Sequence, residues 1–379
     1  KPIVSISDGN PRLAIMTAQL AKDRQNIYVL HDVSELFEKY FSTFVKDNGE
    51  FANTLNIKCL GLIAFFYTIP YKNKEITTPI LENFDIGYSE FIDAIDVLEK
   101  LELVELQFEH VKIPEQNLST YFFYKAFIKD NVLSFDTLLK RCFYSNSNRF
   151  RDCVVPANNT FGSNNVMEKL QPYLKNHLKE IESEKEKAFK FFSIFWFYLQ
   201  TETLEFILNL VNALASVPSP KYSINDSENN SVFDKSDKVI ELLSEFFRFH
   251  INLKDAIELS FEYVKKKPEQ LSELIHKIRE RLPFDKEDYQ WNFQRQEILF
   301  QVLFDGLRKF DSLLAVAFYE LSKTFLAFQF HHTIRESFSF PAIRSCPILC
   351  SSDAQTKAAS RSNLFWSRQG INLFFDMFS

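Results

Sequence analysis

The stretch of the chain that decides the fold is "SEFIDAIDVLEKLELVELQFEHVKI", residues 89–113. In its first half, helical spacing gathers four apolar residues on one stripe: Ile92, Ile95, Leu98 and Leu101. Its second half alternates with a period of two, which sets Val104, Leu106, Phe108 and Val111 against Leu103, Glu105, Gln107 and Glu109. The pattern predicts a helix followed by a two-stranded ribbon.

Two more helices are predicted before this one. The stretch "NTLNIKCLGLIAFFYTI", residues 53–69, has the apolar content of a buried helix, and "TTPILENF", residues 77–84, is typical of a short one. Three helices followed by a hairpin is the order of a winged helix-turn-helix. We therefore expect a winged helix over residues 51–115.

The charge of this predicted domain argues against DNA binding. Residues 51–115 contain five lysines, no arginine and eleven acidic residues, a net charge of −6. The third helix displays its acids on the face opposite the apolar stripe: Glu90, Asp93, Asp96 and Glu99. Because each phosphate contact requires a cation, this face would repel a duplex. The pattern favours a contact with protein, either another chain or another part of this one.

The composition of the whole chain indicates a globular, helix-rich protein. Its 379 residues are 46% hydrophobic and 25% charged, with 42 phenylalanines and only seven glycines. Glycine is common in β-turns, so its scarcity favours long helices over a sandwich or barrel. The length is sufficient for two or three domains with buried cores. The net charge of −6 offers no general attraction to nucleic acid or to an anionic membrane.

Cysteine usage and hydropathy lead us to expect a cytoplasmic location. The five cysteines are scattered and odd in number, which is typical of a reducing compartment. The longest apolar run, Phe191–Leu199, has nine residues. Because a transmembrane helix needs about 20 residues, we expect no contact with the membrane interior.

The remainder of the chain is predicted to be helical, with two exceptions. We expect a helical domain over residues 116–216, interrupted by a polar break around Pro156, and helical repeats over residues 237–336. Between them, residues 217–236 are rich in Pro, Ser, Asn and Asp, as in a linker. Residues 337–379 form a divergent tail with nine serines and no helical period.

One αα-hairpin is predicted within the repeats. The stretch "DAIELSFEYVKKKPEQLSELIHKIRERL", residues 255–282, gives a helix, a break at Pro268 and a second helix. No fixed-period consensus emerges from residues 237–336. The predicted fold class is therefore mostly α, a winged helix-turn-helix followed by an irregular α-helical repeat, or α-solenoid, region.

The familiar catalytic motifs are missing from the sequence. None of the seven glycines is followed by lysine, which a phosphate-binding loop requires, and none of the seven histidines is followed by glutamate, as in zinc proteases. No catalytic residue is predicted. His331, His332, Cys346 and Cys350 could form a tetrahedral metal site, but their irregular spacing favours a polar helix end and unrelated tail cysteines. We predict no metal.

Near its start the chain carries "SDGNPRLAIMTAQLAKD", residues 7–23. Gly9 and Asn10 are suited to a turn, and Pro11 is tolerated at the first position of the helix that follows. One interpretation is an ordinary capped helix start. The other is that this turn forms one wall of a nucleotide site.

This turn, followed by a helix and then a winged helix, resembles the exit from the nucleotide-binding module of STAND-class signalling ATPases. Other stretches are similar to the middle of large bacterial STAND proteins, particularly antiphage-defence types, up to about residue 335: "IDVLEKLELVEL", "VKIPEQNLSTYFFYKAFIKD", "NRFRDCVVPANNTFG" and "FFRFHINLKDAIELSFEYVKKKP". The tail fits this pattern poorly.

The resemblance implies roles for four residues at the predicted end of an NTPase module, residues 1–50. In that superfamily a Gly-x-Pro turn enters a small helical subdomain and the proline ring packs on adenine. Pro11 would then contact the base, Gly9 and Asn10 would shape the turn, and Arg12 would contact a phosphate or a neighbouring domain. The nucleotide, ATP or ADP, would be held mainly by residues outside this chain.

The resemblance also implies partners and a function. A P-loop and an effector domain would lie upstream, a protein trigger would bind the helical repeats, and activation would form a homo-oligomer. Any ATPase activity would depend on that upstream P-loop. The expected function is the sensor portion of a nucleotide switch in bacterial defence or signalling. Two alternatives stay open: a winged-helix transcription regulator, and an α-solenoid adaptor with no nucleotide role.

Overall fold

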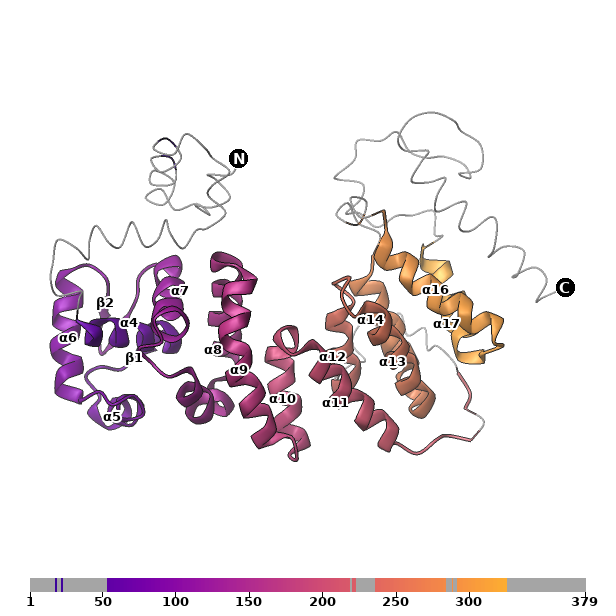
Figure 1. Ribbon diagram of the computed structural model, residues 1–379, viewed down its shortest axis with the longest axis horizontal. Coiled ribbons are helices and arrows are strands. Elements are labelled where there is room, and N and C mark those ends of the chain that lie inside the picture. Colours follow the sequence, from indigo (N-terminus) through magenta and orange to yellow (C-terminus); the bar gives the residue numbers. More distant parts are fainter. Residues whose placement is uncertain are drawn as a thin grey trace. The chain divides into compact units, whose positions relative to one another are not determined.

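The computed structural model describes residues 53–218, 220–222, 236–283 and 292–325, together with the single positions 18, 22 and 288. Within these residues the chain is mostly α-helical, with thirteen α-helices and one three-stranded antiparallel sheet (Figure 1). The mostly helical class is therefore confirmed. The chain divides into two compact units between Leu199 and Gln200, and each is described by itself. The six segments predicted from the sequence stay predictions.

The first unit begins with three helices and a small sheet. Its elements are α4 (Thr54–Phe66), β1 (Thr68–Ile69), α5 (Lys74–Glu82), α6 (Tyr88–Lys100), β2 (Glu105–Gln107) and β3 (His110–Lys112). Strand β3 lies in the middle of the sheet, because Val111 pairs with Ile69 on one side and with Leu106 on the other. The three predicted helices and the predicted ribbon are confirmed in order.

Strand β1 was not predicted. The helix expected over residues 53–69 ends at Phe66, because Tyr67 takes a left-handed backbone conformation with φ of 68°. The next two residues then pair with β3. Helix α5 begins earlier than the predicted Thr77, because the side chain of Asn73 caps it by accepting a hydrogen bond from the amide of Ile76, at 3.2 Å.

Two details of the predicted pattern at residues 89–113 are wrong. The buried stripe of α6 is Phe91, Ala94, Ile95 and Leu98, whereas Ile92 and Leu101 are only half-buried. Because the helix packs on both α4 and α5, the side of the helix that carries Phe91 and Ala94 is buried as well. Phe108 does not lie on the apolar face of the ribbon. It occupies the turn between β2 and β3 and is exposed.

The rest of the first unit is helical. Its elements are α7 (Gln116–Tyr124), the π-helix η3 (Lys125–Lys129), α8 (Phe135–Phe161), α9 (Ser163–Ile181), α10 (Lys185–Phe195) and the 3₁₀-helix η4 (Trp196–Tyr198). Of these, α7, η3 and α8 pack on α4, and α9 and α10 pack on α8. Aromatic rings join these helices. Phe150 of α8 lies 4.9 Å from the ring of Phe65 and 5.4 Å from that of Phe143, which in turn lies 5.3 Å from Phe191. One aromatic core thus runs from α4 to α10.

The polar break predicted around Pro156 does not fall at the proline itself, because α8 continues through it. Its buried residues, Phe150, Cys153, Val154, Ala157 and Phe161, keep helical spacing across it. The chain departs from helical geometry elsewhere. Asn146 has φ of −131° and ψ of 32° inside α8, and Gly162 ends the helix with φ of 90°. The packing of the apolar stripe outweighs the hydrogen bond that the proline cannot donate.

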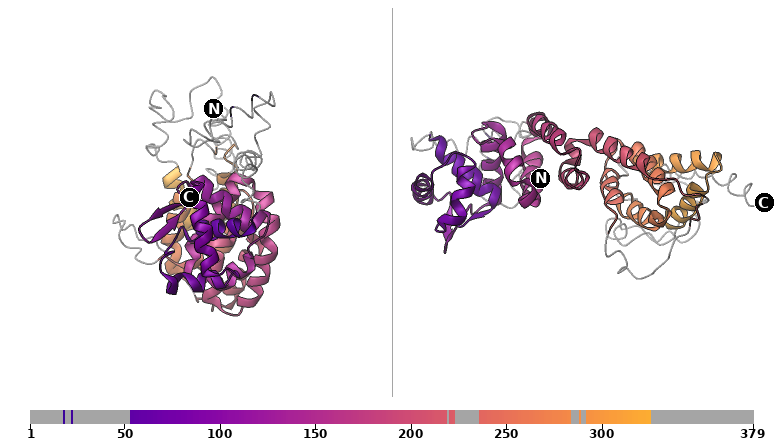
Figure 2. Two further views of the ribbon diagram at one scale, coloured as in Figure 1. Left: turned by 90° about the vertical axis from the view of Figure 1, so that its left-hand side faces the viewer. Right: turned by 90° about the horizontal axis from the view of Figure 1, so that it is seen from below.

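The second unit contains only helices among its described residues. They are α11 (Gln200–Ala213), α12 (Lys238–Phe246), α13 (Leu253–Lys266), the 3₁₀-helix η5 (Pro268–Gln270), α14 (Leu271–Arg281), α16 (Gln294–Arg308) and α17 (Ser312–Phe325). Alternate helices lie side by side: α11 contacts α13, which contacts α16, while α12 contacts α14, which contacts α17. Figure 2 shows these helices from two further directions.

The helix, break and helix predicted around Pro268 are confirmed as α13, η5 and α14. The two helices do not pack mainly on each other, however. The largest contact of α13 is with α16 and that of α14 is with α12. Within the part of the chain that the structure describes, no helix combines the length and apolar character needed to cross a membrane.

We expect the substitution Gly61→Ala to destabilise the first unit. A Cβ at this position of α4 would lie 2.4 Å from the Cβ of Ala126 and 3.1 Å from Leu133. The overlap should cost about 1–3 kcal/mol, although alanine favours the helix by about 1 kcal/mol. Urea unfolding followed by circular dichroism measures the change. The double variant Gly61→Ala/Ala126→Gly should recover part of the loss, and an increase in stability on Gly61→Ala alone would contradict the prediction.

We also expect the first unit to lose stability as the pH falls. His177 of α9 is buried beside Phe191, and neither of its ring nitrogens has a hydrogen-bond partner. Burial lowers the pKa of His177, an effect that the nearby Glu180 carboxylate partly opposes. His177 therefore takes up a proton more readily in the unfolded chain than in the folded chain. Its contribution to stability is present above about pH 6.5 and is lost as the pH falls below that value.

Unfolding midpoints measured between pH 5 and pH 8 test this dependence. The variant His177→Phe should flatten it, because the buried ring then has no proton to gain. The variant His110→Gln, which changes an exposed histidine of β3, is the control and should leave the slope as it is. An unchanged slope in His177→Phe would refute the assignment.

Candidate functional site

The predicted nucleotide-contacting residues lie outside the described residues, so their roles stay predictions: Gly9, Asn10, Pro11 and Arg12. The same holds for the four residues considered as metal ligands: His331, His332, Cys346 and Cys350. The described residues contain two polar surfaces with distinct chemistry. One is the outer face of α6 with the neighbouring hairpin, and the other joins α12 to α14.

The outer face of α6 is acidic, as the sequence predicts. Its four acids, Glu90, Asp93, Asp96 and Glu99, are all exposed, while Phe91 and Leu98 on the opposite face are fully buried. Glu90 has a structural role as well, because its carboxylate accepts a hydrogen bond from the amide of Gly87 at 2.9 Å and so caps the helix. The fold therefore separates the core-forming and charged faces of this helix.

The charge of this face is not neutralised locally. Among the ion pairs of the described residues, none involves Asp93, Asp96 or Glu99. These three carboxylates project from one helix into solvent. Each pair of like charges three residues apart destabilises the helix by roughly 0.2–0.5 kcal/mol. The face can attract a cationic surface and repels phosphate groups.

The turn between β2 and β3 presents an aromatic ring to solvent. Gln107 pairs with His110, which leaves a two-residue turn formed by Phe108 and Glu109. Phe108 is 88% exposed, and its φ of 57° lies in the left-handed region. A left-handed backbone costs a residue with a Cβ roughly 1–2 kcal/mol. We call this feature the hairpin tip.

The positively charged side chain of Arg149, on α8, caps the C-terminal end of α4. The guanidinium group of Arg149 donates hydrogen bonds to the carbonyl oxygens of Phe65, at 2.8 Å, and Ala64, at 3.1 Å. It also lies 5.5 Å from the ring of Tyr67, the residue that ends the helix. Carbonyl groups in the last turn of a helix have no partner within the helix, and a positive charge there complements the helix dipole. Arg149 thus fixes the α4 end to α8.

The described cysteines are poorly suited to act as nucleophiles. Cys59, Cys142 and Cys153 are free and buried. Burial raises the pKa of Cys59 and Cys153 to about 12 and that of Cys142 to about 11, so each thiol stays protonated near neutral pH. No group of three or more potential metal ligands occurs among the described residues.

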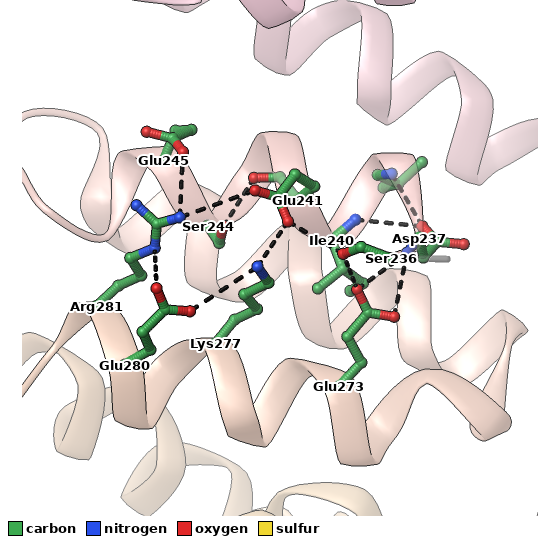
Figure 3. A network of polar contacts seen from close by, with 11 residues as sticks. Ser236, Asp237, Ile240, Glu241, Ser244, Glu245, Glu273, Lys277, Glu280 and Arg281 are labelled. Carbon is green, nitrogen blue, oxygen red and sulfur yellow. Dashed lines mark hydrogen bonds and ion pairs between the residues drawn. The ribbon is translucent and has the colours of Figure 1, made fainter. Parts of the chain in front are cut away.

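The second polar surface joins α12 to α14 by a row of ion pairs (Figure 3). Lys277 of α14 lies between two carboxylates, 2.6 Å from that of Glu241 on α12 and 3.8 Å from that of Glu280. One turn further along, Arg281 contacts Glu245 of α12 at 3.4 Å. Figure 3 shows these side chains meeting between the two helices, so the charges of this surface are paired with one another, three carboxylates with two cations.

The same row ends in a buried carboxylate at the start of α12. Glu273 of α14 is only 4% exposed and accepts hydrogen bonds from the hydroxyl of Ser236 and, at 2.9 Å, from the amide of Asp237. Asp237 in turn caps the amide of Val239 at 2.9 Å and accepts a hydrogen bond from the hydroxyl of Tyr263 at 2.8 Å. Burial and this bond raise the pKa of Tyr263. These hydrogen bonds join the start of α12 to Tyr263 of α13 and Glu273 of α14, which is a structural role.

Sequence reasoning missed several residues that matter here. It assigned Phe108 to the apolar face of the ribbon. The alternation holds from Val104 to Phe108, but Val111 follows after three residues instead of two, and this change of spacing indicates a turn. It gave no role to Arg149 or Glu273, because their partners lie 84 and 36 residues away in the chain. No local pattern marks such a pairing.

Comparison with known proteins identifies no relative of this chain: no family model, curated protein or solved structure matches it.

We expect Glu273→Gln to destabilise the second unit. The glutamine oxygen can still accept from Ser236 and from the amide of Asp237, but both bonds lose their charge assistance, and an NH2 group replaces Oε2, which also accepts from the Asp237 amide at 3.2 Å. Loss of buried, charge-assisted hydrogen bonds should cost about 1–3 kcal/mol. Thermal and urea unfolding measure the change.

The matched control is Glu280→Gln, the same substitution on the same helix at an exposed position. Its ion pairs are at the surface and should contribute less than about 1 kcal/mol. Equal losses in the two variants would contradict the role assigned to Glu273.

Proposed function

We propose that this chain is the regulatory and sensor portion of a STAND-type nucleotide-switch protein. In this proposal the segment from α4 to β3 is a winged helix that works by docking against protein. The helices from α11 to α17 belong to a repeat region that recognises a protein trigger. The cellular role is bacterial defence or signalling, in the cytoplasm.

The single observation that carries the proposal is the acidic α6 in its structural setting. The order α4, β1, α5, α6, β2, β3, with β3 in the middle of the sheet, supports a winged helix in which α6 is the third helix. In a DNA-binding domain of this kind, that helix would face the duplex. Here it presents Asp93, Asp96 and Glu99, which supports a switch element that moves against other protein.

The packing of the second unit supports the repeat region. Helices α11, α13 and α16 lie in one row and α12, α14 and α17 in another, as successive helix pairs do in an α-solenoid. Ion pairs fix neighbours within the second row: Lys277 with Glu241, and Arg279 with Glu320 at 3.6 Å. Such a stack would offer a stable surface to a protein trigger.

The nucleotide part of the proposal rests on the resemblance described above. Pro11 would contact the base of ATP or ADP, Arg12 would sense a phosphate or a neighbouring domain, and Gly9 and Asn10 would shape the turn. Most of the nucleotide contacts, the effector domain and the homo-oligomer formed on activation would involve residues outside this chain. Differential contacts in two nucleotide states are what such a switch requires.

The order of helices and strands also fits a winged-helix transcription regulator. That alternative predicts affinity for duplex DNA that falls with rising salt. The acidic face of α6 disfavours it. An α-solenoid adaptor with no nucleotide role is distinguished by the nucleotide experiment below.

We expect Pro11→Ala and Arg12→Ala to weaken nucleotide binding in the protein that joins this chain to its ATPase module. Loss of one contact to the base or phosphate should reduce affinity about tenfold, or about 1.4 kcal/mol. Isothermal titration with ADP and ATP measures the change, and activation by the trigger gives a second readout. Lys179→Ala, at an exposed position of α9, is the control.

Unchanged nucleotide affinity and activation in both variants would refute the proposal. A titration of this chain with a 20-base-pair duplex at low salt separates the main alternative. Salt-dependent binding would favour a transcription regulator over a switch.

A further inference from the structure

The hairpin tip has an aromatic residue that the fold itself does not use. Phe108 is 88% exposed, so it contributes almost nothing to the core of the first unit. Its left-handed backbone is one that glycine or asparagine adopts more readily. A bulky residue in such a conformation, with no packing inside its own chain, is a feature found at binding sites.

The surroundings of this ring are acidic. Glu109, beside Phe108 in the turn, is exposed and takes part in no ion pair within the described residues. Glu105 is paired with Lys112 at 3.4 Å, which neutralises the one lysine of the hairpin. The hairpin tip is thus an exposed hydrophobic ring beside an unpaired carboxylate, that of Glu109, and we call this acidic side the rim.

We propose that Phe108 is the anchor through which the winged-helix segment docks on a protein surface that carries an apolar patch bordered by lysine or arginine. The proposal rests on the function given above, because it names the chemistry of the surface against which that segment works. Aromatic anchors with a polar rim are the usual centre of a protein interface. The acidic rim selects a cationic border and speeds the encounter with it.

The same charges argue against two other occupants. An anionic bilayer would accept the ring of Phe108 but would repel Glu109. Nucleic acid bases would stack on the ring, but a stacking platform needs interleaved cations to hold the phosphates, and the lysine of this hairpin is already paired.

The second unit supplies a matched control. Phe310, in the turn between α16 and α17, is 86% exposed and has φ of 57°, almost the same values as Phe108. The two residues before it, Arg308 and Lys309, are exposed cations, and the acid that follows it, Asp311, is paired with Lys265 at 2.9 Å. Phe310 therefore shares the exposure and the backbone conformation of Phe108 but not the acidic rim.

The experiment uses the full chain and a fluorescein-labelled, helical peptide of leucine and lysine, with its leucine–glutamate counterpart as the charge control. The variants are Phe108→Gly, Phe108→Asn and Phe310→Gly. Fluorescence anisotropy at several salt concentrations measures binding, and thermal unfolding measures stability.

We expect the chain to bind the leucine–lysine peptide, with affinity that falls as salt rises, and not to bind the leucine–glutamate peptide. Phe108→Gly and Phe108→Asn should weaken binding at least tenfold while leaving the unfolding temperature unchanged or higher, because both suit the left-handed turn. Phe310→Gly should leave binding unchanged.

Equal peptide affinity in Phe108→Gly and the unchanged chain would overturn the proposal. So would binding to phosphatidylserine vesicles that depends on Phe108, because the occupant would then be a membrane. No nucleotide takes part in this experiment. A negative peptide result would therefore not affect the nucleotide test of the proposed function. A negative nucleotide result would likewise not change the measured effect of Phe108 on peptide binding.

Discussion

The first unit depends on how the end of α4 is held. Two carbonyl oxygens of its last turn, those of Ala64 and Phe65, accept hydrogen bonds from the guanidinium group of Arg149, which comes from α8. The next residue of α8, Phe150, packs its ring 4.9 Å from that of Phe65. A charged cap and an aromatic contact therefore act at the same point, and each positions the other. Without Arg149 the carbonyl oxygen of Phe65 would lose this charged donor, and that of Ala64 would keep only the weak thiol donor of Cys153, at 3.8 Å.

This arrangement has a consequence for the proposed switch. Helix α4 contacts α6 and β3 of the predicted winged helix as well as α7 and α8. The acidic face of α6 and the hairpin tip are thus mounted on a rigid aromatic core. A force applied to the tip by a docked partner would reach α8 and α10 through packed rings rather than through a flexible joint.

The two units use their charges differently. In the first, Asp93, Asp96 and Glu99 remain exposed and without an ion pair among the described residues. In the second, the charges of α12 and α14 meet one another, and Glu273 is buried at the start of α12. Neutralised charges hold helices together, whereas charges left in solvent are available to a partner. This contrast supports a docking role for the first unit and a stable stack for the second.

Much of the fold follows from local patterns that the sequence contains. Helical and two-residue periods locate α6 and the ribbon, and the placement of acids opposite the apolar stripe determines that α6 is charged on its outer face. These properties depend on neighbours within a few residues, so spacing alone specifies them. Only the tertiary structure decided the third strand, the continuation of α8 through Pro156, and the partners of Arg149 and Glu273. In each case a contact between residues far apart in the chain outweighs the local preference, and no local pattern encodes which distant residue will supply that contact.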